Sequence, residues 1–211
     1  MAASEVAIVN MSLNRIGQTT ITAAQLTAAS ETIPYYCSLH YGQTRDALLR
    51  LHWWRFAGDR SNLTAATAPA FQWTYAWTLP TDFLRMRYVW DDNNSAKEKS
   101  LYSYELEGLE IFTNETPCKI KYTKKETTTT NFDPLFTEVL ILQLAKKLVY
   151  AIAGVKNTLA KEINEELYPL LRQARTIDKQ EQNTVGRNEA DTWNDALYGG
   201  GLRDPLKLGS A

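Results

Sequence analysis

Apolar residues recur at helical spacing near both ends of the chain and alternate with polar residues in the middle. In the N-terminal part the spacing predicts a helix over residues 4–16, ended by Gly17, and a long second helix from about residue 30 to 57, ended by Gly58. The apolar positions of the first helix are Val6, Val9, Leu13 and Ile16. The Thr-rich stretch between the two helices predicts a connection with at most a short helical turn.

Two further helices are predicted in the C-terminal part. Asp133 can cap a helix in which Pro134 takes the first position and which Gly154 ends. The next helix begins at Asn157 or Thr158, and Pro169 inside it predicts a kink. Its apolar face has an a/d-like spacing, formed by Ile163, Leu167, Leu170, Ala174 and Ile177.

The segment between these pairs of helices has the period of two that is typical of strands. We expect one small antiparallel sheet over residues 70–123. One aromatic face is predicted along residues 71–79 and another along residues 84–90, the latter followed by the turn DDNN. A hairpin is expected around Glu107-Gly108. The last strand places Cys118, Ile120 and Tyr122 on one face.

Helices, then strands, then helices predict an α+β fold, with a helical bundle built from both ends and a small antiparallel β domain inserted. The expected parts are a first helical part over residues 1–60, the β domain over 70–123, a second helical part over 133–181 and an extended C-terminal tail over 183–211. The tail is polar and rich in glycine, so it is not expected to fold alone.

Composition narrows the class of protein. The chain has 211 residues, 44% of them hydrophobic, with six Trp and eleven Tyr. A net charge of −1 weighs against tight binding of nucleic acid, which depends mainly on Lys and Arg. The N-terminus does not resemble a signal peptide, and no apolar run is long enough for a membrane span. Cys37 and Cys118 are interpreted as buried thiols in a reducing compartment.

Few patterns in the sequence indicate catalysis. There is no phosphate-binding loop, no GxSxG and no HExxH. His40 and His52 are twelve residues apart, which is not the spacing of a metal-ligand pair. Glu162, Glu165 and Glu166 are interpreted as a solvated helix face, and Glu105, Glu107 and Glu110 flank a turn. We therefore predict no enzyme activity, no metal and no cofactor; a hydrolase whose site leaves no sequence pattern is the alternative.

The adjacent pair Trp53 and Trp54 stands in LLRLHWWRFAGDR, which we expect to be helical. On a helix the two rings fall on different arcs. One arc holds Leu48, Leu49, Trp53 and Phe56, and the other holds Ala47, Leu51 and Trp54. Either both arcs pack within the same domain, or the arc of Leu51 and Trp54 faces another subunit. The second interpretation places Trp53 in the core.

Several segments, in the same order, resemble the head-to-tail adaptor family of short-tailed bacteriophages, also called tail tubular protein A. RDALLRLHWWRFA is similar to the end of that family's second helix, although Trp53 stands where many members have proline. The aromatic segment and Leu-Pro-x-Asp, the third helix, and the end of the last helix are also similar, from about residue 4 to 195. The matching residues are Arg45, Leu48, Leu49, Trp54, Phe56, Ala57, Leu79, Pro80, Asp82, Arg85, Ala174, Arg175, Asp178, Glu181 and Trp193.

The resemblance implies a structural virion protein at the head-tail junction, assembled in the host cytoplasm. Such adaptors form a homo-oligomeric ring, usually of twelve copies, beneath the portal protein. The ring carries the tail nozzle or fibres, and viral DNA passes through its lumen without specific binding, so we expect a polar or acidic lumen. An assembly scaffold or chaperone absent from the mature particle is the alternative.

The tail is expected to be part of the partner-binding surface. Its apolar residues have no helix or strand period that would place them in the core. The resemblance implies that these residues run along the portal or the adjacent subunit. The alternative is that the tail folds back on the helices of its own chain. The expected partner-binding residues are Leu51, Trp54, Trp193, Leu197, Tyr198, Leu202, Leu206 and Leu208.

Overall fold

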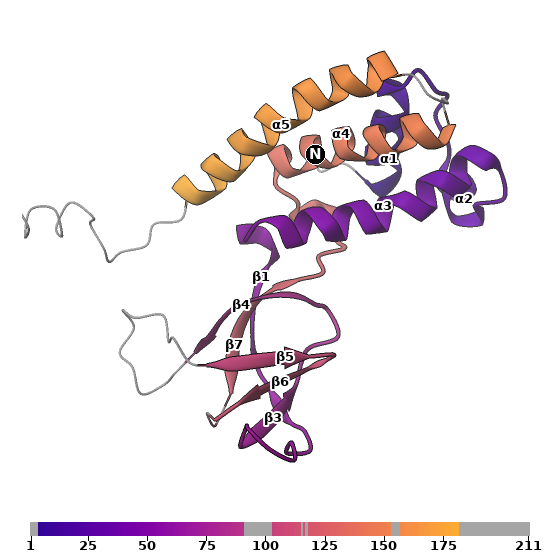
Figure 1. Ribbon diagram of the computed structural model, residues 1–211. Helices are drawn as coiled ribbons and strands as arrows, with labels where there is room; N and C mark the ends of the chain where they lie inside the picture. The colour runs from indigo at the N-terminus through magenta and orange to yellow at the C-terminus, as the bar shows by residue number, and fades with distance from the viewer. Residues whose placement is uncertain (1–3, 91–102, 115, 117, 153–156, 182–211) are drawn as a thin grey trace, which may run out of the picture. The chain divides into compact units, whose positions relative to one another are not determined.

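A computed structural model describes residues 4–90, 103–114, 116, 118–152 and 157–181 (Figure 1). Its architecture is α+β, as the sequence predicts. The described helices are α1 (Glu5–Arg15), α2 (Ala23–Ala28), α3 (Thr32–Leu51), α4 (Pro134–Ile152) and α5 (Asn157–Gln180), with single 3₁₀ turns η1 (Arg55–Ala57) and η2 (Thr129–Asn131). The stop expected at Gly154, the DDNN turn and the C-terminal tail lie outside the described residues.

Helix α4 is the centre of the helical part, where it packs against α1, α3 and α5 (Figure 1). Most positions from Val139 to Val149 are buried, as expected for a helix that packs against three others. Asp133 caps it as predicted: the Oδ1 atom accepts hydrogen bonds from the backbone N–H groups of Leu135 and Phe136 at 2.8 and 3.1 Å. Its buried residues are Phe136, Val139, Leu140, Ile141, Leu142, Leu144, Ala145, Leu148 and Val149.

Helix α5 presents the predicted apolar face to this core. Ile163, Leu167 and Ala174 are buried, and Leu170 packs against the same cluster. The opposite face is solvated as expected, because Glu162, Glu165 and Glu166 are all exposed, the last paired with Arg15 of α1. Pro169 does lie inside the helix, and the kink there stays a prediction.

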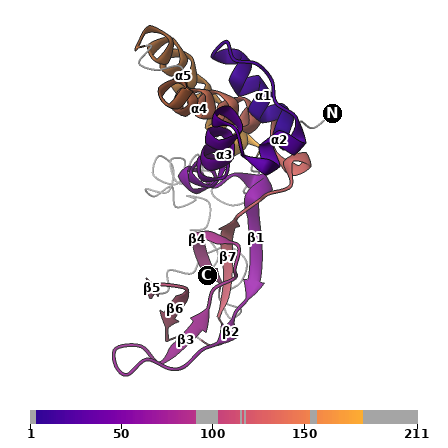
Figure 2. The same ribbon diagram turned by 90° about the vertical axis from the view of Figure 1, so that its right-hand side faces the viewer.

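The strands form two antiparallel sheets, whereas the sequence predicted one. Sheet A has the order β1-β7-β4, and sheet B has the order β2-β3-β6-β5. β7 lies between β1 and β4 in Figure 2. The bounds are β1 Gly58–Asn62, β2 Thr64–Ala65, β3 Tyr75–Thr78, β4 Phe83–Trp90, β5 Tyr104–Glu107, β6 Glu110–Thr113 and β7 Lys119–Lys124.

Strand β1 was not predicted. It begins at Gly58, the residue that the sequence marked as a helix end, and pairs with β7 from Gly58↔Thr123 to Asn62↔Lys119. The strand that enters the β segment from α3 is therefore a neighbour of the strand that leaves it toward α4. The hairpin at Glu107-Gly108 and the buried face of Cys118, Ile120 and Tyr122 are confirmed.

Alternation fails in the two aromatic segments. In the first, only Tyr75–Thr78 is a strand; Phe71 is exposed, and Ala76 and Trp77 are buried next to each other. In β4 the register against β7 shifts between Met86 and Tyr88. Because a bulge inserts a residue into the two-residue repeat, the side chains beyond it change face. Val89 is consequently buried, and Trp90 is exposed.

The loop after β7 contains the buried carboxylate of Glu126. It accepts hydrogen bonds from the Thr128 N–H at 2.9 Å and the Asn131 side chain at 3.1 Å, and it pairs with Lys124 at 3.2 Å. Burial raises the pKa of Glu126, but these partners outweigh burial and leave the pKa below its usual value.

The lowered pKa of Glu126 predicts a loss of stability in acid. A carboxyl group whose folded pKa is depressed stabilises the fold above its unfolded pKa of about 4.3, and that contribution disappears as the pH falls through the folded pKa. Glu126→Gln should therefore lower the free energy of unfolding at neutral pH and flatten its decline in acid. Denaturant unfolding over a pH series measures both effects. Glu162→Gln, at an exposed position, is the control; an unchanged acid slope in Glu126→Gln would contradict the prediction.

Candidate functional site

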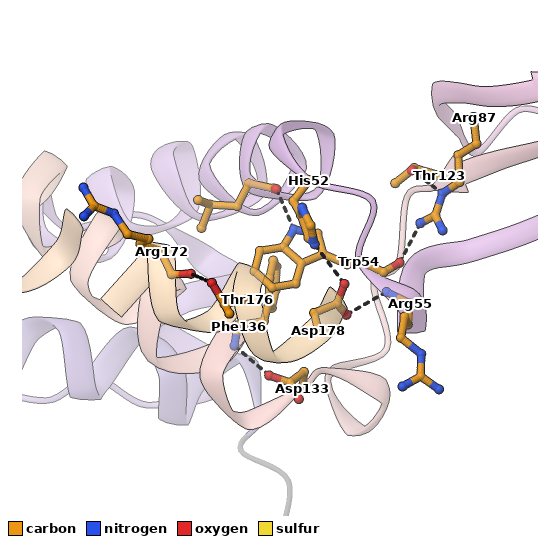
Figure 3. Close-up of polar contacts among 11 residues, drawn as sticks. His52, Trp54, Arg55, Arg87, Thr123, Asp133, Phe136, Arg172, Thr176 and Asp178 are labelled. Atoms are coloured by element: carbon orange, nitrogen blue, oxygen red, sulfur yellow. Dashed lines mark hydrogen bonds and ion pairs between the residues drawn. The ribbon is translucent and has the colours of Figure 1, made fainter. Parts of the chain in front are cut away.

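The candidate site is the junction where the end of α3, the last turns of α5 and sheet A meet (Figure 3). Helix α3 ends at Leu51, before the predicted end at residue 57, and His52 is extended. The last carbonyl groups of a helix have no partner inside the helix. Here the Trp54 indole N–H donates to the Leu48 carbonyl at 2.9 Å, and the Arg85 guanidinium donates to the Arg50 carbonyl at 3.0 Å. These two side chains therefore stabilise the early end of α3.

Trp54 is the centre of an aromatic cluster beneath this helix end. Its side chain is completely buried, and its ring lies edge-on to Phe136 of α4, with 5.1 Å between the ring centroids. His52 lies at 4.9 Å and Phe56 at 6.2 Å from the same ring. Such edge contacts stabilise aromatic pairs beyond the area that they bury.

The two tryptophans therefore have roles opposite to the expected ones. Trp54 is not available to another subunit, because it fills the core of its own chain. Trp53 is 38% exposed, and the guanidinium of Arg85 lies over its ring at 5.7 Å from the centroid. The expectation failed because it assumed a helix through residue 57; once the helix stops at Leu51, the 100° spacing no longer applies.

Asp178 ties the last turns of α5 to the chain beyond α3. One carboxylate oxygen, Oδ2, lies 2.9 Å from His52 Nε2, and the other, Oδ1, accepts the backbone N–H of Arg55 at 3.0 Å. The side chains of His52 and Asp178 are only 10% and 11% exposed. Figure 3 shows both bonds converging on the one carboxylate.

Arg87 of β4 joins the same chain segment to sheet A. Its guanidinium donates to the Trp54 carbonyl at 2.6 Å and to the Thr123 hydroxyl at 3.0 Å. Burial lowers the pKa of Arg87, and the negative charge of Asp178 opposes that shift. Gly58 makes room for the group, because a Cβ atom there would lie 2.7 Å from Arg87 Nη1. A side chain at residue 58 would therefore displace the guanidinium.

The hydrogen bonds of Asp178 and Arg87 connect the segment that follows α3 to α5 and to sheet A. A His-Asp pair activates a Ser, Cys or Thr only when that nucleophile lies within hydrogen-bond reach of the imidazole. Within the described part of the chain, no hydroxyl or thiol hydrogen-bonds to His52. Cys37 and Cys118 are free and buried, and burial raises the pKa of each thiol to about 11, so both stay protonated near neutral pH.

The sequence-predicted partner residues are distributed differently from the expectation. Leu51 is 54% exposed at the end of α3 and remains accessible. The expected tail residues Trp193, Leu197, Tyr198, Leu202, Leu206 and Leu208 lie outside the described residues. The junction residues His52, Arg87 and Gly58 were not predicted as site residues, since their partners are distant in sequence. Asp178 was marked only by the family resemblance.

Comparison of the sequence with protein-family models and with curated proteins finds no match. Among the described residues, no three His, Cys, Asp or Glu side chains gather as a metal site would require. No described helix has both the length and the apolar character to cross a membrane.

Proposed function

We propose that this chain is a structural virion protein, the head-to-tail adaptor of a short-tailed bacteriophage. The observation that carries the proposal is where the motif residues lie. Trp54, Arg85 and Asp178 come from three separate segments that resemble the adaptor family, and all three meet at the junction. Asp178 and the residue whose backbone N–H it accepts there, Arg55, are 123 residues apart in sequence. The resemblance therefore involves residues that pack together, which supports a common fold over chance similarity.

The surface of the described residues suits a subunit of a larger assembly. A ring of identical copies needs heterologous contacts, in which each copy offers two different faces. Large exposed hydrophobic side chains occur on helices, loops and strands alike, and contact with a neighbouring copy would remove some of them from water. They include Tyr35, Leu39, Leu51, Trp53, Phe71, Leu109, Tyr150 and Tyr168.

In this proposal the chain forms a closed ring beneath the portal protein, and a tail nozzle or fibre protein binds below the ring. The resemblance to the adaptor family implies twelve copies in the ring. Viral DNA passes through the lumen without specific binding. No enzyme activity, metal or cofactor is part of the role. The tail beyond residue 183 docks on the portal or on the adjacent copy, with Trp193 as its first anchor. Leu51, exposed at the end of α3, is a further contact.

Purified phage particles test the proposal. We expect mass spectrometry to find this chain at one fixed ratio to the portal protein, and symmetry-averaged imaging to place it as a ring at the head-tail junction. The protein purified alone should be a monomer or a weak oligomer. Presence during assembly but absence from mature particles would instead identify a scaffold, and a stable isolated twofold dimer would also contradict the ring.

A truncated chain lacking residues 190–211 tests the tail in the same experiment. It should keep the melting temperature of the full chain, because no helix or strand pattern places the tail in the core, but it should no longer attach to portal-bearing heads. In the full chain Trp193→Ala should weaken attachment in the same way, and Asn194→Ala, one residue away, is its matched control. Normal attachment of the truncated chain would show that the tail does not dock.

A further inference from the structure

The side of α4 that faces away from α1 carries polar and aromatic side chains. Ser12 of α1 donates to the Ile141 carbonyl of α4 at 3.1 Å, so α1 covers that side of the helix. Tyr150 follows about two and a half turns later and therefore lies on the opposite side, where it is 55% exposed. Lys146 shares this side one turn earlier. Because α4 lies between α3 and α5 (Figure 1), these two helices flank the side, which we call the open α4 face.

Both flanking helices add side chains to the open α4 face. The Nζ atom of Lys146 lies over the ring of Tyr168 of α5, 5.7 Å from the centroid, and Tyr168 is 59% exposed. On the α3 side, Tyr36 and His40 are stacked with 6.3 Å between their ring centroids. The positive charge of Lys147 acts on His40. The face therefore combines cations and aromatic rings from three helices.

The lysines of the open α4 face have no counter-charge within the part of the chain that the structure describes. Neither Lys146 nor Lys147 forms an ion pair or a side-chain hydrogen bond there. Burial lowers the pKa of Lys147. Burial and the charge of Lys147 together lower the pKa of His40. Both shifts have the direction expected where no carboxylate stabilises the protonated form.

The α5 side of the face holds two buried polar atoms that lack partners. Asn164 Oδ1 and Arg175 Nε form no hydrogen bond within the described residues. Asn164, Tyr168 and Arg175 recur at helical spacing, so they lie on the same side of α5. Arg175 is also a third cation without an ion pair in the described chain. A buried polar atom without a partner destabilises a fold, so a further segment that binds here would be favoured.

The C-terminal tail has the complementary composition. Residues 189–198, EADTWNDALY, contain three carboxylates and no Lys or Arg. Trp193 stands between Asp191 and Asp195 in this segment, and Tyr198 ends it. Carboxylates pair with Lys and Arg through charge-assisted hydrogen bonds, and a tryptophan ring packs well against tyrosine rings. The segment therefore matches the open α4 face in both charge and aromatic character.

We propose that residues 189–198 of one copy bind the open α4 face of the adjacent copy. Trp193 would pack against Tyr150 and Tyr168, and the carboxylates on either side of it would approach the three cations. This inference rests on the proposed ring, in which each copy needs two different contact faces. The tail is one of them and the open α4 face is the other. A single contact of this size is weak, and closure of the ring joins many of them.

A nucleic acid is the competing occupant, since cations and aromatic rings also bind that ligand. The net charge of −1 gives the whole chain no general attraction for a polyanion. A nucleic acid on the open α4 face would also leave the acidic segment of the tail without a partner. The tail of a second copy satisfies both surfaces at once.

Disulfide trapping between two full-length proteins with different tags tests the contact. One carries Thr192→Cys, next to Trp193, and the other carries Gln143→Cys, one turn before Lys146; the native cysteines are both buried. The control partner carries Glu162→Cys on the exposed face of α5. Under mild oxidation the Gln143→Cys protein should form the mixed disulfide at least about tenfold faster than the control, a ratio equivalent to ~1.4 kcal/mol. Equal rates would overturn the proposal.

A protein that carries both Thr192→Cys and Gln143→Cys distinguishes the adjacent copy from the same chain. If the tail binds the adjacent copy, disulfide-linked chains of several copies should form, and their yield should rise with protein concentration. An internal disulfide that forms at every dilution, without linked copies, would mean that the tail folds back on its own helices. The proposal would then be wrong.

Charge reversal tests which groups recognise the tail. Lys146→Glu with Lys147→Glu reverses the face, and Asp191→Lys with Asp195→Lys reverses the tail. Each reversal alone should abolish trapping because like charges then meet, and the two reversed proteins together should recover it. Lys161→Glu, at an exposed position of α5, is the matched control. Trapping that neither reversal alters, or that does not recover in variants with unchanged melting temperatures, would contradict the contact; Lys146→Glu alone is the milder variant if the double reversal unfolds.

A fluorescent DNA duplex identifies the competing occupant. If the unaltered chain binds the duplex, the reversed face loses that binding and the mixed disulfide never forms, the open α4 face binds nucleic acid and the proposal is wrong. The ring and the contact can fail separately. A ring in the particle without trapping overturns only the tail contact, whereas trapping in a protein that is absent from particles preserves the contact and overturns the adaptor role.

Discussion

Replacing Trp54 with alanine is expected to lower the free energy of unfolding by about 3–5 kcal/mol, the usual cost of truncating a large buried aromatic residue. The ring is fully buried against Phe136, so its removal leaves a cavity in the core. It also removes the indole N–H from the Leu48 carbonyl, which then lacks its partner at a buried helix end.

Trp53→Ala is the matched control, because it removes the same side chain one residue away. Trp53 is partly exposed and lies under Arg85, so we expect a loss of about 1 kcal/mol or less, the size of an exposed cation–π contact. Denaturant unfolding of both variants, compared through their midpoints and slopes, measures the difference. Equal losses in the two variants would mean that Trp54 is not the core residue of the pair.

Arg87→Met should be the next most damaging change, with a loss of about 2–3 kcal/mol. Methionine keeps much of the side-chain length but leaves the buried Trp54 carbonyl and the Thr123 hydroxyl without their donor, and an unsatisfied buried polar group costs about 1–3 kcal/mol. Relief of the desolvated positive charge offsets part of that loss. The expected result is a less stable protein in which the sheet loosens from the end of α3.

Hydrogen exchange separates that local loosening from general unfolding. In Arg87→Met the amides of β1 and β7 should exchange faster, while those in the middle of α4 keep their protection relative to the global stability. Arg85→Met is the control, because Arg85 bonds the Arg50 carbonyl at a more exposed position. Full stability in Arg87→Met would show that water replaces the guanidinium without cost.

Local signals allowed the helical part to be predicted from the sequence. Asp133 caps α4 by accepting the backbone N–H groups two and three residues further along the chain. The apolar face of α5 repeats within a single helix. Both features depend only on residues that are close together in the sequence. Cys118, Ile120 and Tyr122 alternate along β7 and the residue before it, where the pairing with β1 has no register shift, and all three are buried.

Non-local partners decided the rest. Trp54 leaves the helical path, and its ring packs edge-on against Phe136, which lies far along the chain. The β4 bulge depends on pairing with β7, so the sequence of β4 alone placed Tyr88 and Met86 on one face. His52 appeared isolated because its partner, Asp178, is 126 residues away. The resemblance marked Asp178, but only the fold shows what it binds.

The pairing of β1 with β7 has a consequence for how the molecule tolerates change. Because Gly58 and Thr123 are partners on adjacent strands, the chain leaves the helical part and returns to it across one strand spacing of roughly 4.8 Å. The β segment therefore connects α3 to α4 through two closely spaced ends, as a tight loop would, whatever the length of the segment. Loop-closure entropy rises only slowly with length, so residues added at the far hairpins cost the helical core little. The two sheets can thus diverge to fit new partners while the helices keep their packing.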